Sequence, residues 1–302
     1  MASLRQIRRR LRSIQSTKQI MRAMQLVSGS KLKRAQTKLQ QAHGIVEFLD
    51  RLRERVLASL PSSTHPLCAV REGQPSVLVV LTSDAGLCGS YNTNLIQLAE
   101  SYLRRDSFKN TQLISIGKKG HRTLTKRGYR VVEAYLDLAG RPNVAKADAI
   151  GRALMQRFLS GQVGSVQLLY SQCVSTSVSR PTVVTWLPIQ LQGGRGQETG
   201  GTGTSSLAPR PSPLAPVLDY IFEPSPERVL EDLLPRWALA KFQVILLEAF
   251  ASEHSARMIA MKNATDNAEE LLDGLTRQRN KVRQATITKE LLEIVGTAEA
   301  LK

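Results

Sequence analysis

A glycine-rich turn holds the residues whose types and spacing come closest to a chemical site. It reads Ser83-Asp-Ala-Gly-Leu-Cys-Gly-Ser90 and lies between a predicted buried strand and a predicted helix. Turns in this position hold phosphate in many α/β proteins. This one matches neither GxGxxG nor GxxxxGK[ST], and no following lysine is placed to reach a phosphate. We therefore interpret Gly86 and Gly89 as a tight strand-to-helix turn with Asp84 as a local cap, and keep a small nucleotide-binding enzyme as an alternative.

Cys88 lies in the same turn, at the start of the predicted helix, where the pKa of a thiol falls and a nucleophile can be activated. No arrangement of the four histidines supports such a nucleophile. We therefore expect Cys88 to be a small packed thiol. The sequence also shows no Ser/His/Asp set, no paired carboxylates and no metal-ligand spacing. Catalysis, a cofactor and a metal site are not expected of this chain.

Composition excludes several classes of protein. Of the 302 residues, 42% are apolar, which is enough for a packed core. No apolar run reaches the length of about 18 residues that a membrane span needs. The three cysteines include no CxxC pair, which argues against a disulfide framework or a zinc site and favours a reducing compartment.

The net charge of +17 is unevenly distributed. Residues 1–60 carry 14 Lys and Arg against 3 Asp and Glu, whereas residues 217–302 carry 11 against 14. The clusters at Arg8–Arg10 and Lys31–Arg34 indicate either a negative partner or a solvated helix face. The Arg-rich start also resembles a mitochondrial transit peptide. Its apolar period continues without the change in composition that would mark the end of such a peptide, so we interpret it as part of the mature fold.

Two long helical patterns, over residues 1–60 and 217–302, flank these motifs. In both, apolar residues recur every three or four positions, and Ser225-Pro-Glu227 is a favourable helix start. Such helices reach on the order of 90–110 Å at 1.5 Å per residue. Neither can bury its apolar stripe alone, so we expect an antiparallel coiled coil that forms a shaft. Pro235 should kink or break the second helix near Leu234.

Between the two helices, residues 61–192 predict a Rossmann-like α/β domain, because short β-branched runs alternate with helical patterns. The predicted strands are 76–81, 111–116, 131–135, 165–171 and 182–187, and the predicted helices are 92–105, 118–127 and 144–159. Residues 193–216 are mostly Gly, Thr, Ser and Pro, which predicts a disordered or mobile loop.

A basic cluster interrupts the apolar stripe of the last helix. Its residues, here called the basic collar, are Arg277, Arg279, Lys281 and Arg283. A polar collar below an apolar tip suits a helix end that inserts into another protein, although an exposed helix turn would look the same.

Several longer motifs extend along nearly the whole chain. They are Ile7-Arg-Arg-Arg-Leu-Arg-Ser-Ile14, Thr17-Lys-Gln-Ile20, Ala23-Met-Gln-Leu-Val-Ser-Gly-Ser-Lys-Leu32, Ser83–Asn92, Tyr220-Ile-Phe-Glu-Pro-Ser-Pro226, Ala251-Ser-Glu-His-Ser-Ala-Arg-Met258, Ala264-Thr-Asp-Asn267 and Asn280-Lys-Val-Arg-Gln-Ala-Thr-Ile-Thr-Lys-Glu-Leu291. In this order they resemble the gamma subunit of F-type ATP synthases.

The resemblance implies a central rotor stalk. In that family the terminal helices form an antiparallel coiled coil inside a ring of three alpha and three beta subunits. The α/β domain lies at the foot, against the epsilon subunit and the ring of c subunits. Proton flow would turn the foot, and the shaft would drive each beta subunit through its nucleotide-binding states. The chain would then be a non-catalytic subunit, peripheral to the cytoplasmic face of a bacterial inner membrane and attached to that membrane through the c-ring.

The resemblance also implies partner contacts. By motif position, Arg257, Gln284 and Thr288 are expected to make polar contacts with a beta subunit, and Met24 is expected to face a beta-subunit loop. The basic N-terminal helix is expected to face an acidic beta-subunit loop.

The chain departs from the family pattern in places. Ala85 stands where the family usually has Arg, Arg279 where it has Tyr, and Val282 where it has Ala. The loop 193–216 lies where plant-type gamma subunits carry a regulatory insertion, but it has no cysteine, so thiol-controlled switching is not expected.

The runner-up interpretation is a basic coiled-coil protein that binds nucleic acid. It predicts affinity that falls steeply with salt. Stacking platforms are missing from the basic segment, because the first aromatic residue is Phe48. The acidic balance of the last helix also argues against it.

Overall fold

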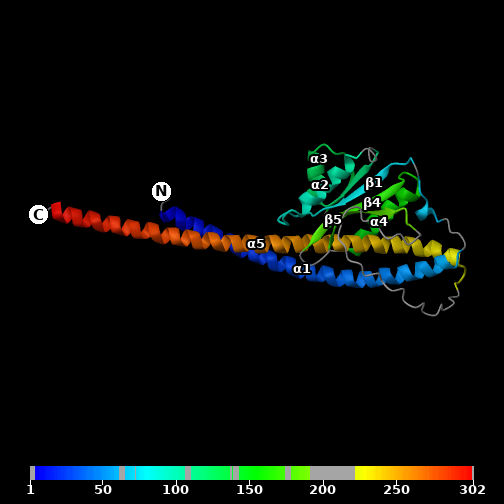
Figure 1. Ribbon diagram of the computed structural model, residues 1–302, viewed down its shortest axis with the longest axis horizontal. Helices are drawn as coiled ribbons and strands as arrows, with labels where there is room; N and C mark the ends of the chain where they lie inside the picture. The colour runs from blue at the N-terminus through cyan, green and yellow to red at the C-terminus, as the bar shows by residue number, and fades with distance from the viewer. Residues whose placement is uncertain are drawn as a thin grey trace, which may run out of the picture.

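Two helices of unusual length run side by side, and an α/β domain packs against one part of them (Figure 1). The computed structural model describes residues 4–60, 65–71, 73–105, 110–136, 138, 143–173, 178–190 and 222–300. Helix α1 spans Leu4–Ala58 and helix α5 spans Pro226–Ala300. Their 55 and 75 residues correspond to about 80 and 110 Å. Both chain ends lie at the same end of the pair, so the predicted antiparallel shaft is confirmed.

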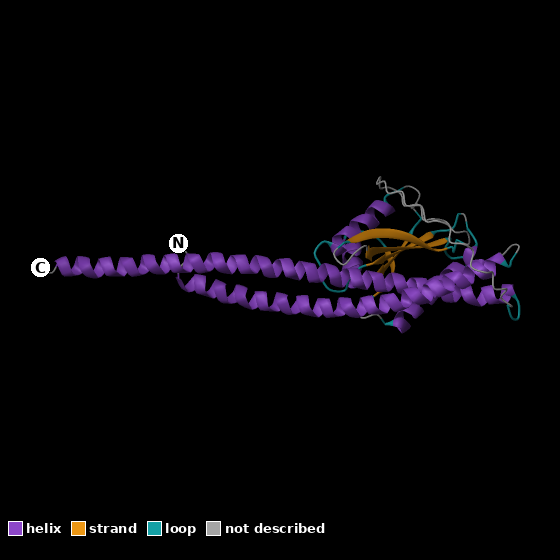
Figure 2. Ribbon diagram, turned by 60° about the horizontal axis from the view of Figure 1, so that its bottom comes forward, coloured by secondary structure: helices purple, strands orange, loops and turns teal. Residues whose placement is uncertain are grey.

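The helices pack closely where α1 carries small residues. Leu32 and Ala35 of α1 form a buried cluster with Ala251 of α5, and Met258 packs against it. A Cβ atom at Gly29 would lie 3.5 Å from the Met258 sulfur, which is ordinary contact. The last part of α5 projects past the start of α1 (Figure 2), and every side chain over residues 283–297 is exposed.

Helix α5 runs through Pro235 as one continuous helix, so it does not break near Leu234, and a kink there stays a prediction. Leu233, Leu234 and Ala238 are buried in the domain core on either side of the proline. Burial of a leucine contributes roughly 1.5–3 kcal/mol. Two buried leucines therefore offset the cost of about 3 kcal/mol for a proline inside a helix.

A five-stranded sheet in the order β3-β2-β1-β4-β5 forms the centre of the domain. All neighbouring strands are parallel except β4 and β5. The strands are β1 (Ser76–Leu81), β2 (Gln112–Ile116), β3 (Val131–Tyr135), β4 (Ser165–Cys173) and β5 (Ser179–Leu187), and the helices are α2 (Tyr91–Leu103), α3 (Lys118–Lys126) and α4 (Val144–Leu159), with a short 3₁₀ helix at Pro66–Cys68. Each strand and helix predicted between residues 76 and 187 is present, with small shifts at its ends. The predicted loop 193–216 lies outside the described residues.

The two faces of the sheet are covered by different helices. Along β1, Val77 and Val79 point into a core built with α4 and α5, whereas Leu78 and Val80 point into a core built with α2. Alternation of this kind follows from the two-residue period of a strand. Helix α5 is therefore at once one half of the shaft and one layer of the domain.

Candidate functional site at the joint between shaft and domain

Side chains of the domain donate hydrogen bonds directly to main-chain carbonyls of α5. Tyr91 Oη lies 3.1 Å from the Ala249 oxygen, and Trp186 Nε1 lies 2.9 Å from the Ala238 oxygen. Ser252 Oγ of α5 in turn donates to a carbonyl of β4 at 2.8 Å. These bonds are buried, where polar groups that are fully paired specify one arrangement. The domain and α5 are therefore fixed to each other by directional contacts as well as by apolar packing.

The turn 83–90 is ordered by its own side chains. Asn92 Oδ1 accepts from the Ser83 main chain at 3.0 Å, and Asn92 Nδ2 donates to Ser83 Oγ at 2.7 Å. Asp84 Oδ1 accepts from the Lys118 main chain at 3.0 Å, so it caps the start of α3 and not a helix of its own segment. The prediction of a local cap is corrected in this respect. Because β1 and β2 are parallel, they end at the same edge of the sheet and bring the start of α3 beside the turn.

Two residues of the turn, one on each side of Cys88, have left-handed backbone angles. Gly89 has a φ of 57°, which glycine adopts without steric cost. Leu87 has a φ of 61° and is 62% exposed. A leucine in this region is uncommon and strained. No sequence pattern predicts the backbone strain at Leu87, because that strain depends on the path of the folded backbone.

The Cys88 thiol is packed inside the turn, as predicted. It is 2% exposed, and Asn92 Nδ2 lies 3.1 Å from its sulfur. A buried thiol of this kind is inert unless the turn opens.

Arg257 of α5 holds the turn against the shaft. Its Nε donates to the Gly86 oxygen and one terminal nitrogen donates to the Ala85 oxygen, both at 3.2 Å. The other terminal nitrogen lies 2.8 Å from Glu253 Oε1 and 3.2 Å from His254 Nδ1. Arg257 is 6% exposed and Glu253 is 4% exposed. A buried ion pair is tolerated only when its donors are used in this way.

Burial also changes the protonation of the groups around this pair. Desolvation raises the pKa of Glu253 above its usual 4.5, although Arg257 opposes the shift. Desolvation raises the pKa of Tyr91 well above 10, so its hydroxyl stays a donor to α5 at any physiological pH.

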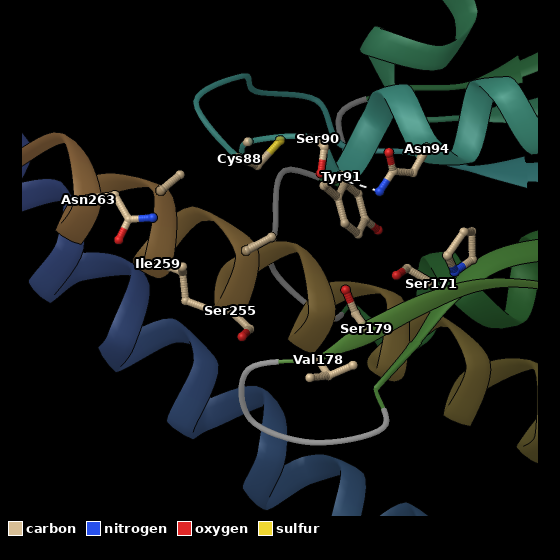
Figure 3. A pocket seen from close by; sticks show the side chains of 14 residues that line it. Cys88, Ser90, Tyr91, Asn94, Ser171, Val178, Ser179, Ser255, Ile259 and Asn263 are labelled. Carbon is tan, nitrogen blue, oxygen red and sulfur yellow. Dashed lines mark hydrogen bonds between the residues drawn. The ribbon is translucent and has the colours of Figure 1, made fainter. Parts of the chain in front are cut away.

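A cavity of about 360 Å³ lies next to the joint, between the start of α2, the strands β4 and β5, and α5 (Figure 3). Its lining combines apolar side chains with hydroxyl and amide groups and includes no charged side chain; the polar residues labelled in Figure 3 include Ser90, Asn94, Ser171, Ser179, Ser255 and Asn263. Such a lining offers no cation for a phosphate. Within the described ranges, no group of three or more His, Cys, Asp or Glu could hold a metal ion. None of the described helices is long and apolar enough to cross a membrane.

The structure separates the remaining predicted contact residues from this joint. Gln284 and Thr288 are exposed on the projecting part of α5, about 40 Å along the helix from Arg257. Met24 is half-buried on α1. The Arg257 guanidinium bonds to groups of its own chain. Its expected contact with a beta subunit stays a prediction.

The basic collar lies between the joint and the tip of α5. Arg277, Lys281 and Arg283 are exposed, whereas Arg279 is half-buried and donates to Asn280 Oδ1 at 3.3 Å. The collar therefore presents its charge outward, as a contact surface would.

Comparison with known proteins identifies the family. A family model described as ATP synthase matches residues 3–301. The chain is 39% identical over 302 residues to the ATP synthase gamma chain of Moorella thermoacetica, with 100% of both chains covered. The chain belongs to the ATP synthase gamma chain family. A second gamma chain, from Symbiobacterium thermophilum, is 40% identical over 298 residues, covering 98% of this chain and 97% of the relative.

Solved structures support the gamma-chain fold. One similar chain is in the rotor of the Euglena gracilis mitochondrial ATP synthase, with a TM-score of 0.63, 17% identity, and 94% of this chain and 98% of that one covered. Another is in the central stalk and c-ring of the Tetrahymena thermophila enzyme, with a TM-score of 0.56, 21% identity, and 81% and 99% covered. The resemblance drawn from the sequence motifs is thus confirmed, and nothing in these comparisons favours the nucleic-acid-binding alternative.

Proposed function

We propose that this gamma chain is the central rotor stalk of an F-type ATP synthase, and that it couples proton-driven rotation of a c-ring to the nucleotide cycle of the catalytic beta subunits. The observation that carries the proposal is that α5 is both a shaft helix and a layer of the α/β domain. A torque on the domain would enter the shaft through the hydrogen bonds at Tyr91, Trp186 and Arg257. One continuous helix, α5, would thus join the part that is turned to the part that turns the hexamer.

Exposure along the projecting part of α5 supports a surrounding hexamer of alpha and beta subunits. Leu292 is 67% exposed and Ile294 is 64% exposed. Apolar side chains gathered on one helix end usually mark a protein contact. Below this tip, the basic collar would meet polar groups of the hexamer, and Gln284 and Thr288 would contact a beta subunit.

At the other end of the shaft, the domain would bind the epsilon subunit and the c-ring. The chain would then be held to the cytoplasmic face of a bacterial inner membrane indirectly, through the c-ring, without a cofactor or nucleic acid. ATP hydrolysis and synthesis would take place on the beta subunits.

Assembly with partner subunits tests the proposal. We expect the chain, expressed with the alpha and beta subunits of its own organism, to purify in a complex of one gamma to three alpha and three beta subunits. A bead attached to the α/β domain of this complex should rotate when ATP is added. A chain that elutes alone while alpha and beta subunits assemble without it would show that the proposal is wrong.

A further inference from the structure

Helix α3 carries a row of exposed cations on the outer face of the domain. At 100° per residue they fall at about 0°, 40°, 80° and 100° around the helix axis. These residues, here called the cationic stripe, are Lys118, Arg122, Lys126 and Lys119. The opposite side of the helix, at about 200–240°, carries the buried Gly120 and Leu124. The stripe therefore lies on the side of the helix that faces away from the domain core, with Lys119 at its margin beside Gly86 of the turn.

The carboxylates near the stripe already bind other groups of this chain. Glu100 of α2 pairs with Arg127 at 2.7 Å, and Asp84 accepts from the main chain of Lys118. Lys119, Arg122 and Lys126 have no ion-pair partner in the part of the chain that the structure describes. The carboxylate of Asp84 at the start of α3 therefore offsets only part of the positive charge that this short helix carries.

The stripe is unfavourable for α3 by itself. Lys118, Arg122 and Lys126 are spaced four residues apart, and like charges at this spacing destabilise a helix. Lys118 and Lys119 also occupy the first turn, where the helix dipole disfavours cations. A negative partner that binds the stripe would compensate both effects.

The start of α3 is held rigidly against β1. Gly117 has a φ of 101°, and a Cβ atom there would lie 2.1 Å from the Thr82 oxygen. A Cβ atom at Gly120 would lie 2.5 Å from Thr82 Oγ1, which accepts a hydrogen bond from the Gly120 main chain at 2.9 Å. The charges of the stripe are therefore presented on a fixed backbone, which lowers the entropic cost of binding.

We propose that the cationic stripe is a docking surface for an acidic segment of another protein of the ATP synthase, with carboxylates spaced to meet Lys119, Arg122 and Lys126. This inference rests on the proposed function. Helix α3 lies on the side of the domain that faces along the shaft toward the chain ends (Figure 1), and under the proposed function this direction leads to the hexamer and away from the membrane. A protein partner is therefore favoured over a lipid surface.

Carbodiimide coupling in the purified complex tests the proposal. The reagent joins a lysine amine to a carboxylate only when the two are in contact. Lys18 and Glu269, 2.7 Å apart, provide an internal positive control. We expect amide links from Lys119 or Lys126 to Asp or Glu of another subunit, identified by mass spectrometry. The Lys18–Glu269 link without any link from Lys119 or Lys126 would overturn the proposal, while a chain that enters no complex would overturn the proposed function as well.

Substitution of the stripe gives a second test. In the complex, Lys119→Gln/Arg122→Gln/Lys126→Gln should weaken retention of the linked subunit roughly tenfold and lower the salt concentration at which it dissociates. The matched control is Arg152→Gln/Arg180→Gln/Arg236→Gln, which removes the same charge from exposed sites elsewhere. Equal weakening by both variants would overturn the proposal. So would a stripe-dependent affinity of the full chain for phosphatidylserine vesicles or duplex DNA with unchanged subunit retention.

Discussion

At Arg257, one guanidinium connects four parts of the joint: two carbonyls of the turn, a carboxylate and an imidazole. Its family motif led us to expect a beta-subunit contact, whereas its observed bonds lie within the chain. The reason is geometric. Residue 257 faces the end of β1, and the turn at that end has main-chain oxygens that no strand uses.

Replacement of Arg257 by Met should destabilise the domain by about 3 kcal/mol, because Glu253 is left as an unpaired buried charge. The double variant Arg257→Met/Glu253→Met should recover most of this loss, since no buried charge remains. Urea unfolding of the full chain followed by tryptophan fluorescence measures both, and Trp186 reports from the core. Equal losses in the single and double variants would contradict a role for the ion pair.

Glu248 provides a test of pH dependence. Burial raises the pKa of this carboxyl above 4.5, with Tyr170 and His43 opposing the shift. The folded state therefore binds the proton more tightly than the unfolded state. The stabilising contribution is complete below pH 4.5 and is lost as the pH rises through the folded pKa. Relative to wild type, Glu248→Gln should gain unfolding free energy progressively between pH 4.5 and 7, measured by urea titration. A constant difference across this range would contradict the raised pKa.

Helix α5 is the element on which the architecture depends. Its first half has apolar residues on the side that meets α4 and the sheet, whereas every apolar residue over 283–297 is exposed. One helix thus combines a buried layer, a coiled-coil strand and a projecting tip. Its continuity through Pro235 follows from the packing of the first half.

Removal of one hydroxyl tests the joint between the domain and α5. Tyr91→Phe should cost about 1 kcal/mol, the usual contribution of a hydrogen bond, because Ala249 loses a donor. The matched control is Tyr129→Phe, which removes a hydroxyl with no bonding partner in the described ranges and should change stability by less than about 0.5 kcal/mol. If both variants unfold at the same urea concentration, the Tyr91 bond does not hold the joint.

Across the whole molecule, basic residues and exposed apolar residues gather toward one end of the shaft. The acid-free start of α1, the basic collar and the uncovered tip all lie toward one end, and the domain lies at the other. A chain with this distribution leaves an apolar surface exposed, which partner subunits would cover under the proposed function. The molecule is therefore expected to be complete only within its complex.

Coupling within the complex tests the contacts predicted at the projecting part of α5. Gln284→Ala/Thr288→Ala should leave the complex intact but lower the number of protons pumped per ATP hydrolysed, because two expected hydrogen bonds to a beta subunit, each contributing roughly 1 kcal/mol, are lost. Thr297→Ala is the control, because the Thr297 hydroxyl donates only to carbonyls of its own helix. Inverted membrane vesicles with a pH-sensitive dye and an ATPase assay give the ratio. Normal pumping in the double variant would count against both assignments.

The long helices, the strands and the glycine turn could be predicted from the sequence, because these depend on apolar period and on local backbone preferences. The family could also be predicted from the sequence, through motifs that lie in order along the chain. Four features follow from the folded arrangement alone: Asp84 caps α3, Arg257 binds the turn, Leu87 is strained and the cationic stripe faces outward. Each of these depends on which elements meet where the parallel strands β1 and β2 end. That edge of the sheet is formed by segments far apart in the sequence, so no local pattern records it.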